Sequence, residues 1–392
     1  MPLLLLLLSL SAAAQPLPRL AHAGFSLEIE PPSLRIAQVR PLSPAAVAGL
    51  LPGDVILTAT PTPAFARSLQ RRAHGESVTL PVRRGSQSLT ISITYVAPPR
   101  ESQPDFDIEY SSVHVGDHRR RLVVTVPRGT PNPPVLLWLP GSGCQSIESP
   151  SGTSPETQFL YSLTRSGYKT VRVEKAGLGD SEGPPCYSAE ASLALDVRAY
   201  AAAIAQFRPA KIFLFGHSAG ATLVPLVLKT AGKVQGVILA GGMGTDFRQY
   251  ILEMRRRALE NAGQPIEPEM AIHTRCLNAL LLENKSPAEI EAAMPDCRRR
   301  VRFDTHPAFV ADWAKLDLAR EWRAAPGLPV LVLHGEADEV TSRSQSEKLA
   351  HHIRGARLMV LPMDHDLCHE KTPGKLAPQA LQASLNFVQE FR

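Results

Sequence analysis

One five-residue segment, Gly216-His217-Ser218-Ala219-Gly220, restricts the fold of this chain more than any other part of its sequence. The apolar run at residues 211–215 enters the segment, and a helical pattern of apolar residues leaves it. This order predicts a strand that turns sharply into a helix, with a glycine on each side leaving room for strained backbone at the serine. Such a turn exposes the serine above a sheet, so Ser218 is a candidate nucleophile. The pentapeptide alone leaves a simple Gly/Ser-rich turn as the alternative.

Length and the amino-terminal sequence indicate how the chain is organised. At 392 residues, we expect two domains, or one domain with a large insertion. Residues 1–14 form an apolar run that ends in small residues, which is typical of a secretory signal peptide. The run is too short to span a membrane, and no later stretch is long and apolar enough, so we expect no transmembrane segment. We therefore expect an exported protein, periplasmic or secreted, with a buried hydrophobic helix as the alternative for residues 1–14.

Basic residues outnumber acidic residues only slightly, and the formal net charge is +5. The excess is scattered in short arginine runs without interleaved aromatic residues or a nucleic-acid motif. We expect solvated surface at these runs and no nucleic-acid partner, with attraction to an anionic envelope surface left open.

The five cysteines support the exported interpretation. Cys144 and Cys186 lie in Gly/Pro-rich loops after two separate expected strands and can meet across the top of a sheet. Cys276 and Cys297 lie close together in one helical region, which suits two antiparallel helices. In an oxidising compartment these pairs predict two disulfides and one free thiol at Cys368, with five unpaired thiols as the alternative. The spacing does not resemble a zinc site, so we expect no metal.

A first unit at residues 20–97 combines short alternating strands with Pro- and Gly-rich turns. Its central stretch, residues 39–57, resembles PDZ domains of exported bacterial proteins. The resemblance extends through a helical pattern at residues 62–73 into a strand and turn at residues 77–85 and another strand at residues 89–95. It implies a small β-rich, PDZ-like domain over the whole unit.

PDZ domains add a peptide strand to a sheet edge and receive its terminal carboxylate on backbone N–H groups. The resemblance therefore implies a peptide or protein C-terminus as a partner, with Gly24, Phe25 and Ser26 in the carboxylate-binding loop. A helix around residues 64–72 would form the other wall of the groove. A domain that only orients or covers the second unit is the alternative.

Residues 98–104 are polar and proline-rich, and we expect them to form a linker. Over residues 105–392, apolar strands alternate with helical patterns, which predicts an α/β fold with a mostly parallel sheet and helices on both faces. A charged helical stretch at about residues 245–325 interrupts the alternation and is long enough to form a lid. The expected strands are 107–115, 121–126, 135–139, 169–173, 211–215, 234–240, 330–334 and 356–361, and the expected helices are 154–166, 189–206, 219–230, 341–352 and 378–391.

Two later loops supply candidate partners for Ser218. Asp338 follows the next-to-last expected strand, and His365 follows the last one. Loops after parallel strands meet at one edge of a sheet, so the three side chains can converge. Their order along the chain resembles the α/β-hydrolase family, over residues 106–392.

The resemblance implies a nucleophile, a general base and an orienting acid. Ser218 would lose its proton to His365, and Asp338 would hold the imidazole in the right tautomer. Other side chains near these loops are open as alternatives for the acid or the base: Glu336, Glu339, Asp364, Asp366, His334 and His369.

A tetrahedral intermediate carries negative charge and needs preorganised N–H donors. The residue after the nucleophile, Ala219, is the first candidate donor for this oxyanion hole. The loop after residues 135–139 supplies the second donor, from Ser142 or Gly143. Relatives often have a His-Gly pair in this loop, whereas this chain has Pro140 in place of the histidine.

Residues 174–183 resemble the Asp-x-Arg-Gly-x-Gly-x-Ser loop of serine aminopeptidase-like and monoacylglycerol-lipase-like hydrolases, with departures at Glu174 and Ala176. The resemblance implies a serine hydrolase that cleaves an ester, thioester or small amide through an acyl-serine intermediate, and residues 1–14 make it an exported one. Its partner would be a small-molecule or acyl substrate, and it would need no cofactor. A catalytically inactive, peptide-binding scaffold of the envelope and an acyltransferase are the alternatives.

Overall fold

The computed structural model of the chain describes residues 15–30, 33–58, 62–188, 190–207, 210–283, 285–299 and 307–391. The signal peptide expected at residues 1–14 lies outside these ranges. The chain divides into two units, one made of Leu17–Arg100 and the other containing Glu101–Arg392. Each unit has a hydrophobic core of its own.

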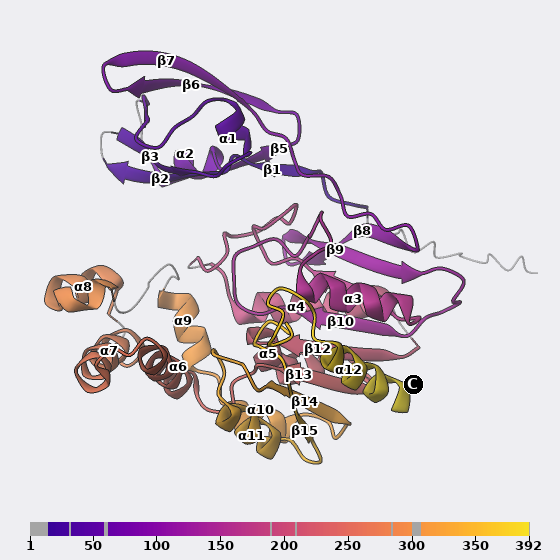
Figure 1. Cartoon of the computed structure of the whole chain (residues 1–392). Helices are drawn as coiled ribbons and strands as arrows, with labels where there is room; N and C mark the ends of the chain where they lie inside the picture. Colours follow the sequence, from indigo (N-terminus) through magenta and orange to yellow (C-terminus); the bar gives the residue numbers. More distant parts are fainter. Residues whose placement is uncertain are drawn as a thin grey trace, which may run out of the picture. The chain divides into compact units, whose positions relative to one another are not determined.

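The unit Leu17–Arg100 consists mainly of short antiparallel strands. One sheet has the strand order β2-β3-β4-β6-β7, and β1 pairs with β5 in a separate two-stranded ribbon. The sheet buries alternate residues such as Leu34, Ile36 and Val82 in one core. The elements, drawn in indigo and violet in Figure 1, are β1 (Leu20–His22), β2 (Phe25–Glu30), β3 (Ser33–Val39), α1 (Pro44–Val47), β4 (Val55–Ile56), α2 (Pro63–Ser68), β5 (Arg71–Ala73), β6 (Ser77–Arg84) and β7 (Gln87–Thr94).

The structure corrects the helix expected at residues 62–73. Helix α2 ends at Ser68, and Arg71–Ala73 form strand β5 against β1. One residue beyond the helix, the Leu69 carbonyl accepts a hydrogen bond from the buried Tyr95 hydroxyl at 2.6 Å. The backbone that follows is bonded to other segments, since the Gln70 carbonyl accepts a hydrogen bond from the Ala23 amide at 2.9 Å and residues 71–73 pair with β1. The helix expected as the second wall of a peptide groove is therefore shorter than the sequence predicted.

The larger unit contains an eight-stranded sheet in the order β15-β14-β13-β12-β10-β11-β9-β8. The strands from β15 to β11 run parallel, whereas β9 is antiparallel to both of its neighbours. Every residue of β10, β12, β13 and β14 is buried, as expected for strands covered on both faces. The strands are β8 (Phe106–Val115), β9 (His118–Pro127), β10 (Val135–Leu139), β11 (Lys169–Val173), β12 (Ile212–His217), β13 (Gly236–Ala240), β14 (Val330–Gly335) and β15 (Arg357–Leu361).

Helices cover both faces of this sheet (Figure 1). On one face, α3 and α12 bury Phe159 and Phe387 in a core that they share with the strands. On the other face, α4, α5 and α11 bury Ala203, Val224 and Leu349 in a second core. The two cores fix the sheet and therefore the loops at its carboxyl ends. These helices are α3 (Pro155–Arg165), α4 (Leu193–Phe207), α5 (Ala219–Leu228), α11 (Arg343–His352) and α12 (Pro378–Glu390).

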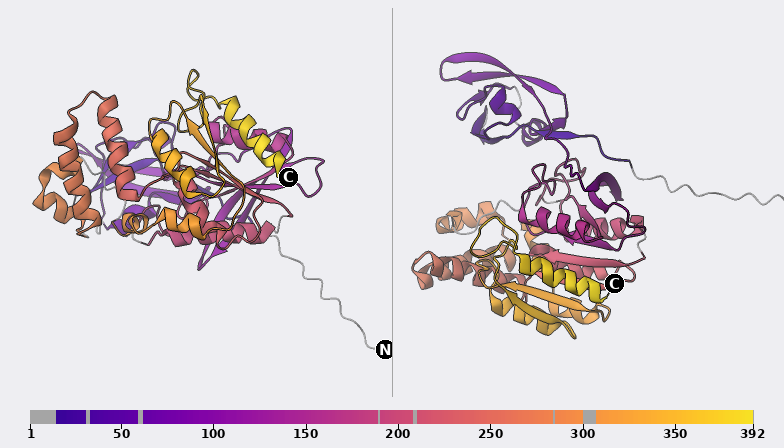
Figure 2. Two further views of the ribbon diagram at one scale, coloured as in Figure 1. Left: turned by 90° about the horizontal axis from the view of Figure 1, so that it is seen from below. Right: turned by 45° about the vertical axis from the view of Figure 1, so that its right-hand side comes forward.

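The insertion between β13 and β14 is helical, and its first helices gather beside one end of the sheet (Figures 1 and 2). A disulfide between Cys276 and Cys297 joins α7 to η1. The last helix, α10, packs against α5 and α11 and buries Trp322 in the core of the sheet, so it is part of the body of the unit. None of the helices in the described ranges is both long and apolar enough to cross a bilayer. The inserted elements are α6 (Phe247–Asn261), α7 (Ile266–Leu281), α8 (Pro287–Ala293), η1 (Pro295–Arg299), α9 (Pro307–Ala314) and α10 (Leu318–Ala324).

Candidate active site

The turn between β12 and α5 holds Ser218 at φ 51° and ψ −120°, a conformation that non-glycine residues seldom adopt. The flanking glycines permit the close packing of this turn. A Cβ on Gly216 would lie 2.5 Å from the Ala221 Cα, and a Cβ on Gly220 would lie 2.0 Å from the Leu139 carbonyl oxygen. Both distances are too short for any side chain, so the Gly-x-Ser-x-Gly pattern follows from the geometry of the turn.

The loops after β14 and β15 bring Asp338 and His365 together. The His365 Nδ1 lies 3.0 Å from the Asp338 Oδ2. The other carboxylate oxygen accepts hydrogen bonds from the amides of Val340 at 2.9 Å and Thr341 at 2.7 Å, which fixes the orientation of the acid. Burial lowers the pKa of His365, but the hydrogen bond and the charge of Asp338 outweigh it, so the pKa is raised above its ordinary value.

The other candidates for the acid and the base have different surroundings. His334 pairs with the Ser346 hydroxyl in the interior. His369 accepts a hydrogen bond at its Nδ1 from the Lys371 amide. Asp364 accepts hydrogen bonds from two amides of its own loop, at 2.9 and 2.8 Å. The remaining candidates have exposed side chains: Glu336, Glu339 and Asp366.

Ser218 and His365 line one cavity of about 1000 Å³. Because the Nδ1 of His365 faces Asp338, its Nε2 is the ring nitrogen left for the serine. Within the described part of the chain, the Ser218 hydroxyl makes no hydrogen bond with this ring, and catalytic hydrogen bonds of this kind often tighten only when substrate binds. The inserted helices contribute an apolar wall of the cavity: Phe247, Tyr250, Ile251, Met254, Phe309 and Trp313.

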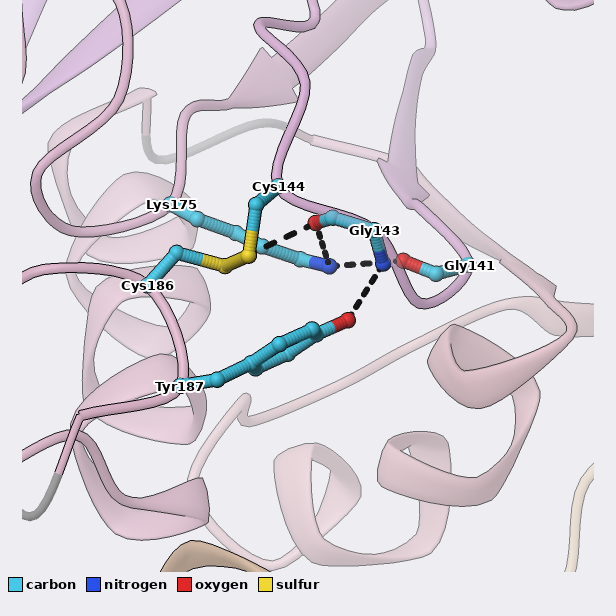
Figure 3. The surroundings of a disulfide bond; sticks show 6 residues. All are labelled: Gly141, Gly143, Cys144, Lys175, Cys186 and Tyr187. Atoms are coloured by element: carbon cyan, nitrogen blue, oxygen red, sulfur yellow. Dashed lines mark hydrogen bonds between the residues drawn. A yellow bond between two sulfur atoms is a disulfide. The ribbon is translucent and has the colours of Figure 1, made fainter. Parts of the chain in front are cut away.

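The loop after β10 passes directly beside the nucleophile. A Cβ on Gly141 would lie 3.1 Å from the Ser218 Cβ. The loop is held from behind by Lys175, whose ammonium donates to the carbonyls of Gly141 at 2.7 Å and Gly143 at 3.1 Å (Figure 3). Its end is joined by the Cys144–Cys186 disulfide to the segment after β11.

The structure distinguishes the amides expected to stabilise an oxyanion. Ala219 begins α5 immediately after the nucleophile. The Gly143 amide already donates to the Tyr187 hydroxyl (Figure 3). This leaves the Ser142 amide, which lies between the two carbonyls held by Lys175, as the stronger candidate for the second donor.

Sequence reasoning missed three residues of this site. Lys175 and Tyr187 hold the loop beside Ser218. Two signals pointed there, because Lys175 belongs to the segment 174–183 noted in the sequence and Tyr187 directly follows Cys186. His217 stacks on Trp138, with ring centroids 5.7 Å apart. Burial lowers the pKa of His217, and its Nε2 donates to the His365 carbonyl at 2.8 Å, which positions the loop of the general base.

One group of side chains in the described residues has the geometry of metal ligands. His217, His365 and Asp366 offer ligand atoms within 4.8 Å of one another. Each of the two histidines has one ring nitrogen bound elsewhere in the protein, the His217 Nε2 to the His365 carbonyl and the His365 Nδ1 to Asp338.

The three residues expected in a peptide-binding loop lie at the start of β2. Gly24, at φ 80°, precedes the strand, whereas Phe25 and Ser26 are already part of it. The Phe25 side chain is buried in the core, and Ser26 is exposed. In the described part of the sheet, β2 pairs with β3 alone and is an edge strand, the position that strand addition needs.

The strand order of the sheet, the helical insertion after β13 and the serine on the turn after β12 define the class of α/β hydrolases. Residues 155–372 match the profile of the family described as serine aminopeptidase, S33, and the chain belongs to that family. Hydrolysis of esters or peptides is therefore supported at the level of the family. Among curated proteins, none matches this chain.

Solved structures share the fold at low sequence identity. Est1E from Butyrivibrio proteoclasticus, solved with ferulic acid, is similar at a TM-score of 0.51 and 16% identity, over 71% of this chain and 98% of its own. A proline iminopeptidase from Mycobacterium smegmatis is similar at a TM-score of 0.49 and 18% identity, over 72% of this chain and 98% of its own. The esterase RhEst1 from Rhodococcus sp. is similar at a TM-score of 0.47 and 22% identity, over 73% of this chain and 99% of its own. Identities this low show the fold alone.

Proposed function

We propose that this chain is an exported serine hydrolase that cleaves an ester, thioester or small amide through an acyl-Ser218 intermediate. The observation that carries the proposal is that Ser218 and His365 open onto one cavity while the far side of the imidazole is paired with Asp338. A serine hydroxyl is a weak nucleophile unless a base removes its proton, and a histidine held by a carboxylate is suited to that task.

In this mechanism the Ser218 Oγ attacks the carbonyl carbon of the substrate and passes its proton to the His365 Nε2. The carbonyl oxygen becomes an oxyanion, which the amides of Ala219 and Ser142 stabilise. His365 then gives the proton to the leaving group, and the acyl-enzyme forms. A water molecule, deprotonated by the same nitrogen, then attacks the acyl carbon. The bond from this carbon to the Ser218 Oγ breaks, His365 returns the proton to Oγ, and the acid leaves.

The apolar wall formed by the inserted helices supports a substrate with an apolar acyl or leaving group. Aromatic side chains from α6 and α9, Phe247, Phe309 and Trp313, line the cavity opposite the sheet. The family is described as serine aminopeptidase, so aminoacyl substrates belong in the test beside esters.

The test compares Ser218→Ala with Ser102→Ala, a matched change at an exposed serine. We expect Ser218→Ala to lose turnover and labelling by a fluorophosphonate probe while its thermal unfolding stays that of the parent. Ser102→Ala should keep both the turnover and the labelling by the probe. The substrates are p-nitrophenyl esters of increasing chain length, acyl thioesters and aminoacyl anilides. Turnover retained by Ser218→Ala would refute the proposal, and a parent chain that the probe does not label would favour an inactive scaffold.

We further propose that the unit Leu17–Arg100 binds the C-terminal segment of a peptide at the edge of β2. The free edge of this strand and the resemblance of residues 39–57 to PDZ domains support the proposal. Fluorescence anisotropy of labelled peptides with the full chain tests it. We expect a free terminal carboxylate to bind more tightly than the same peptide with an amidated terminus, and equal affinity would exclude recognition of the carboxylate.

Export is supported by the apolar residues 1–14 and by the two disulfides. Amino-terminal sequencing of the protein from a periplasmic or culture fraction should begin after residue 14. A chain found only in the cytoplasm with its amino terminus intact would contradict export.

A further inference from the structure

Lys175 is a charged side chain inside the site that the acyl-transfer steps do not use. It follows Glu174 in the loop after β11, and its remaining exposed surface lines the cavity of Ser218. Within the described part of the chain it forms no ion pair, and its hydrogen bonds go to backbone carbonyls. The carboxylates that act on its charge are committed elsewhere, Glu174 to Arg121 and Asp196 to Arg120. A partly buried cation without a paired anion is unfavourable, so its presence here calls for a reason.

The contacts of this ammonium suggest the reason. It donates to the carbonyls of Gly141 and Gly143, which bracket Ser142 (Figure 3). In a trans peptide unit the C=O and the following N–H point in opposite directions. A hydrogen bond that holds the Gly141 carbonyl toward Lys175 therefore turns the Ser142 N–H away from Lys175. The same glycine lies against Ser218, so this peptide unit is next to the nucleophile.

We propose that Lys175 is a positioning residue for the oxyanion hole: it fixes the Gly141–Ser142 peptide unit and polarises its N–H toward the developing oxyanion. This inference rests on the proposed function. Two neutral restraints act on the same loop, the Tyr187 hydroxyl on the Gly143 amide and the disulfide at Cys144. Only Lys175 adds a positive charge, which favours the transition state because negative charge develops there and is absent from the ground state.

The variant Lys175→Met keeps the length of the side chain and removes the charge, and Lys211→Met is its control. Lys211 is exposed just before β12, at the opposite end of that strand from Ser218. We expect Lys175→Met to lower kcat about 10- to 100-fold, somewhat less than the loss of a whole oxyanion donor, and to change KM little. Lys211→Met should leave both constants unchanged.

Inhibition by a trifluoromethyl ketone distinguishes stabilisation of the oxyanion by Lys175 from a merely structural role of this residue. Addition of the Ser218 Oγ to the ketone carbon, with the proton passing to the His365 Nε2, forms a tetrahedral oxyanion without a leaving group. Its inhibition constant should rise in Lys175→Met by the same factor by which kcat falls. In Lys175→Ala, added propylammonium should restore part of the lost turnover, because it can occupy the vacated position of the ammonium.

The wild-type pH profile provides a measurement that does not depend on the folding of Lys175→Met. Burial lowers the pKa of Lys175, and the charges of Asp196 and Glu174 raise it in part. The wild-type kcat should therefore fall as the pH rises toward the ordinary lysine pKa of about 10.4. Lys211→Met should show the same fall.

The outcomes separate the two proposals. Turnover by Ser218→Ala would refute the proposed function itself. Inactive Ser218→Ala together with Lys175→Met that matches Lys211→Met in kcat and ketone affinity would overturn the role of Lys175 alone. If Lys175→Met does not fold, a wild-type kcat that stays constant through the lysine pKa would overturn it.

Discussion

Removal of the Cys144–Cys186 disulfide should reduce both stability and turnover, because this bond joins the loop beside Ser218 to the segment after β11. The change is the double variant Cys144→Ala with Cys186→Ala. The bond closes a loop with a sequence separation of 42 residues. The loop-closure entropy returned to the unfolded chain then corresponds to a loss of about 4 kcal/mol in the free energy of unfolding at 25 °C.

The matched control removes the other disulfide, with Cys276→Ala and Cys297→Ala. This bond has a sequence separation of 21 residues, for which the same reasoning gives about 3 kcal/mol, with a further loss because both cysteines are fully buried. The two variants should thus lose comparable stability. They should differ in chemistry, because only the first disulfide is attached to the loop that carries Ser142.

Guanidinium unfolding followed by tryptophan fluorescence measures the stability, since Trp138, Trp313 and Trp322 all lie in the unit that contains the site. Turnover of a short p-nitrophenyl ester measures the chemistry. We expect kcat to fall roughly tenfold in the first variant and to stay near the parent value in the second. Equal turnover in all three proteins would refute the reasoning that the Cys144–Cys186 disulfide positions the oxyanion loop.

Two further perturbations test the triad and the serine turn. Because Asp338 raises the pKa of His365 and the neutral imidazole is the base, the acid limb of kcat/KM should have its midpoint above about 6.5 and should move to lower pH in Asp338→Asn. The raised pKa of His365 also stabilises the fold below about pH 6.5, and this contribution disappears as the pH rises through that pKa. If the midpoint of the acid limb of kcat/KM did not move in Asp338→Asn, both statements would be contradicted. Gly220→Ala should destabilise the chain by more than about 2 kcal/mol in the guanidinium assay, because the added Cβ would lie 2.0 Å from a carbonyl oxygen. Gly327→Ala, where an added Cβ meets nothing within 4 Å, should unfold as the parent does, and equal stability of the two variants would show that the turn can relax.

Patterns local to the sequence predicted the sheet of the larger unit well. Buried strands on both faces produce uninterrupted apolar runs, so β10 and β11 have the bounds expected from sequence. The sequence also predicted that Asp338 and His365, in the loops after β14 and β15, come together, because parallel strands bring their carboxyl ends to one edge of the sheet.

What the sequence did not predict depends on contacts between distant residues. The end of α2 coincides with contacts to distant residues, because residues 71–73 pair with β1 and the Tyr95 hydroxyl reaches the Leu69 carbonyl 26 positions away. The role of Lys175 depends on carbonyls more than 30 positions earlier, and no side-chain pattern encodes a hydrogen bond to a backbone carbonyl. The buried pair of Glu101 and Arg172, 71 positions apart, is a similar case, since both residues are charged and neither periodicity nor spacing marks them as interior.

The two disulfides have a consequence for how the chain can oxidise. Cys144 and Cys186 are the first and second cysteines of the sequence, and Cys276 and Cys297 are the third and fourth. A chain that enters an oxidising compartment amino terminus first therefore exposes each cysteine to its native partner before the next pair arrives. Cys368 enters last, and burial raises the pKa of its thiol to about 11, so in the folded protein it is a poor attacking group for either bond. Native pairing can be reached by simple sequential oxidation, without reshuffling by an isomerase.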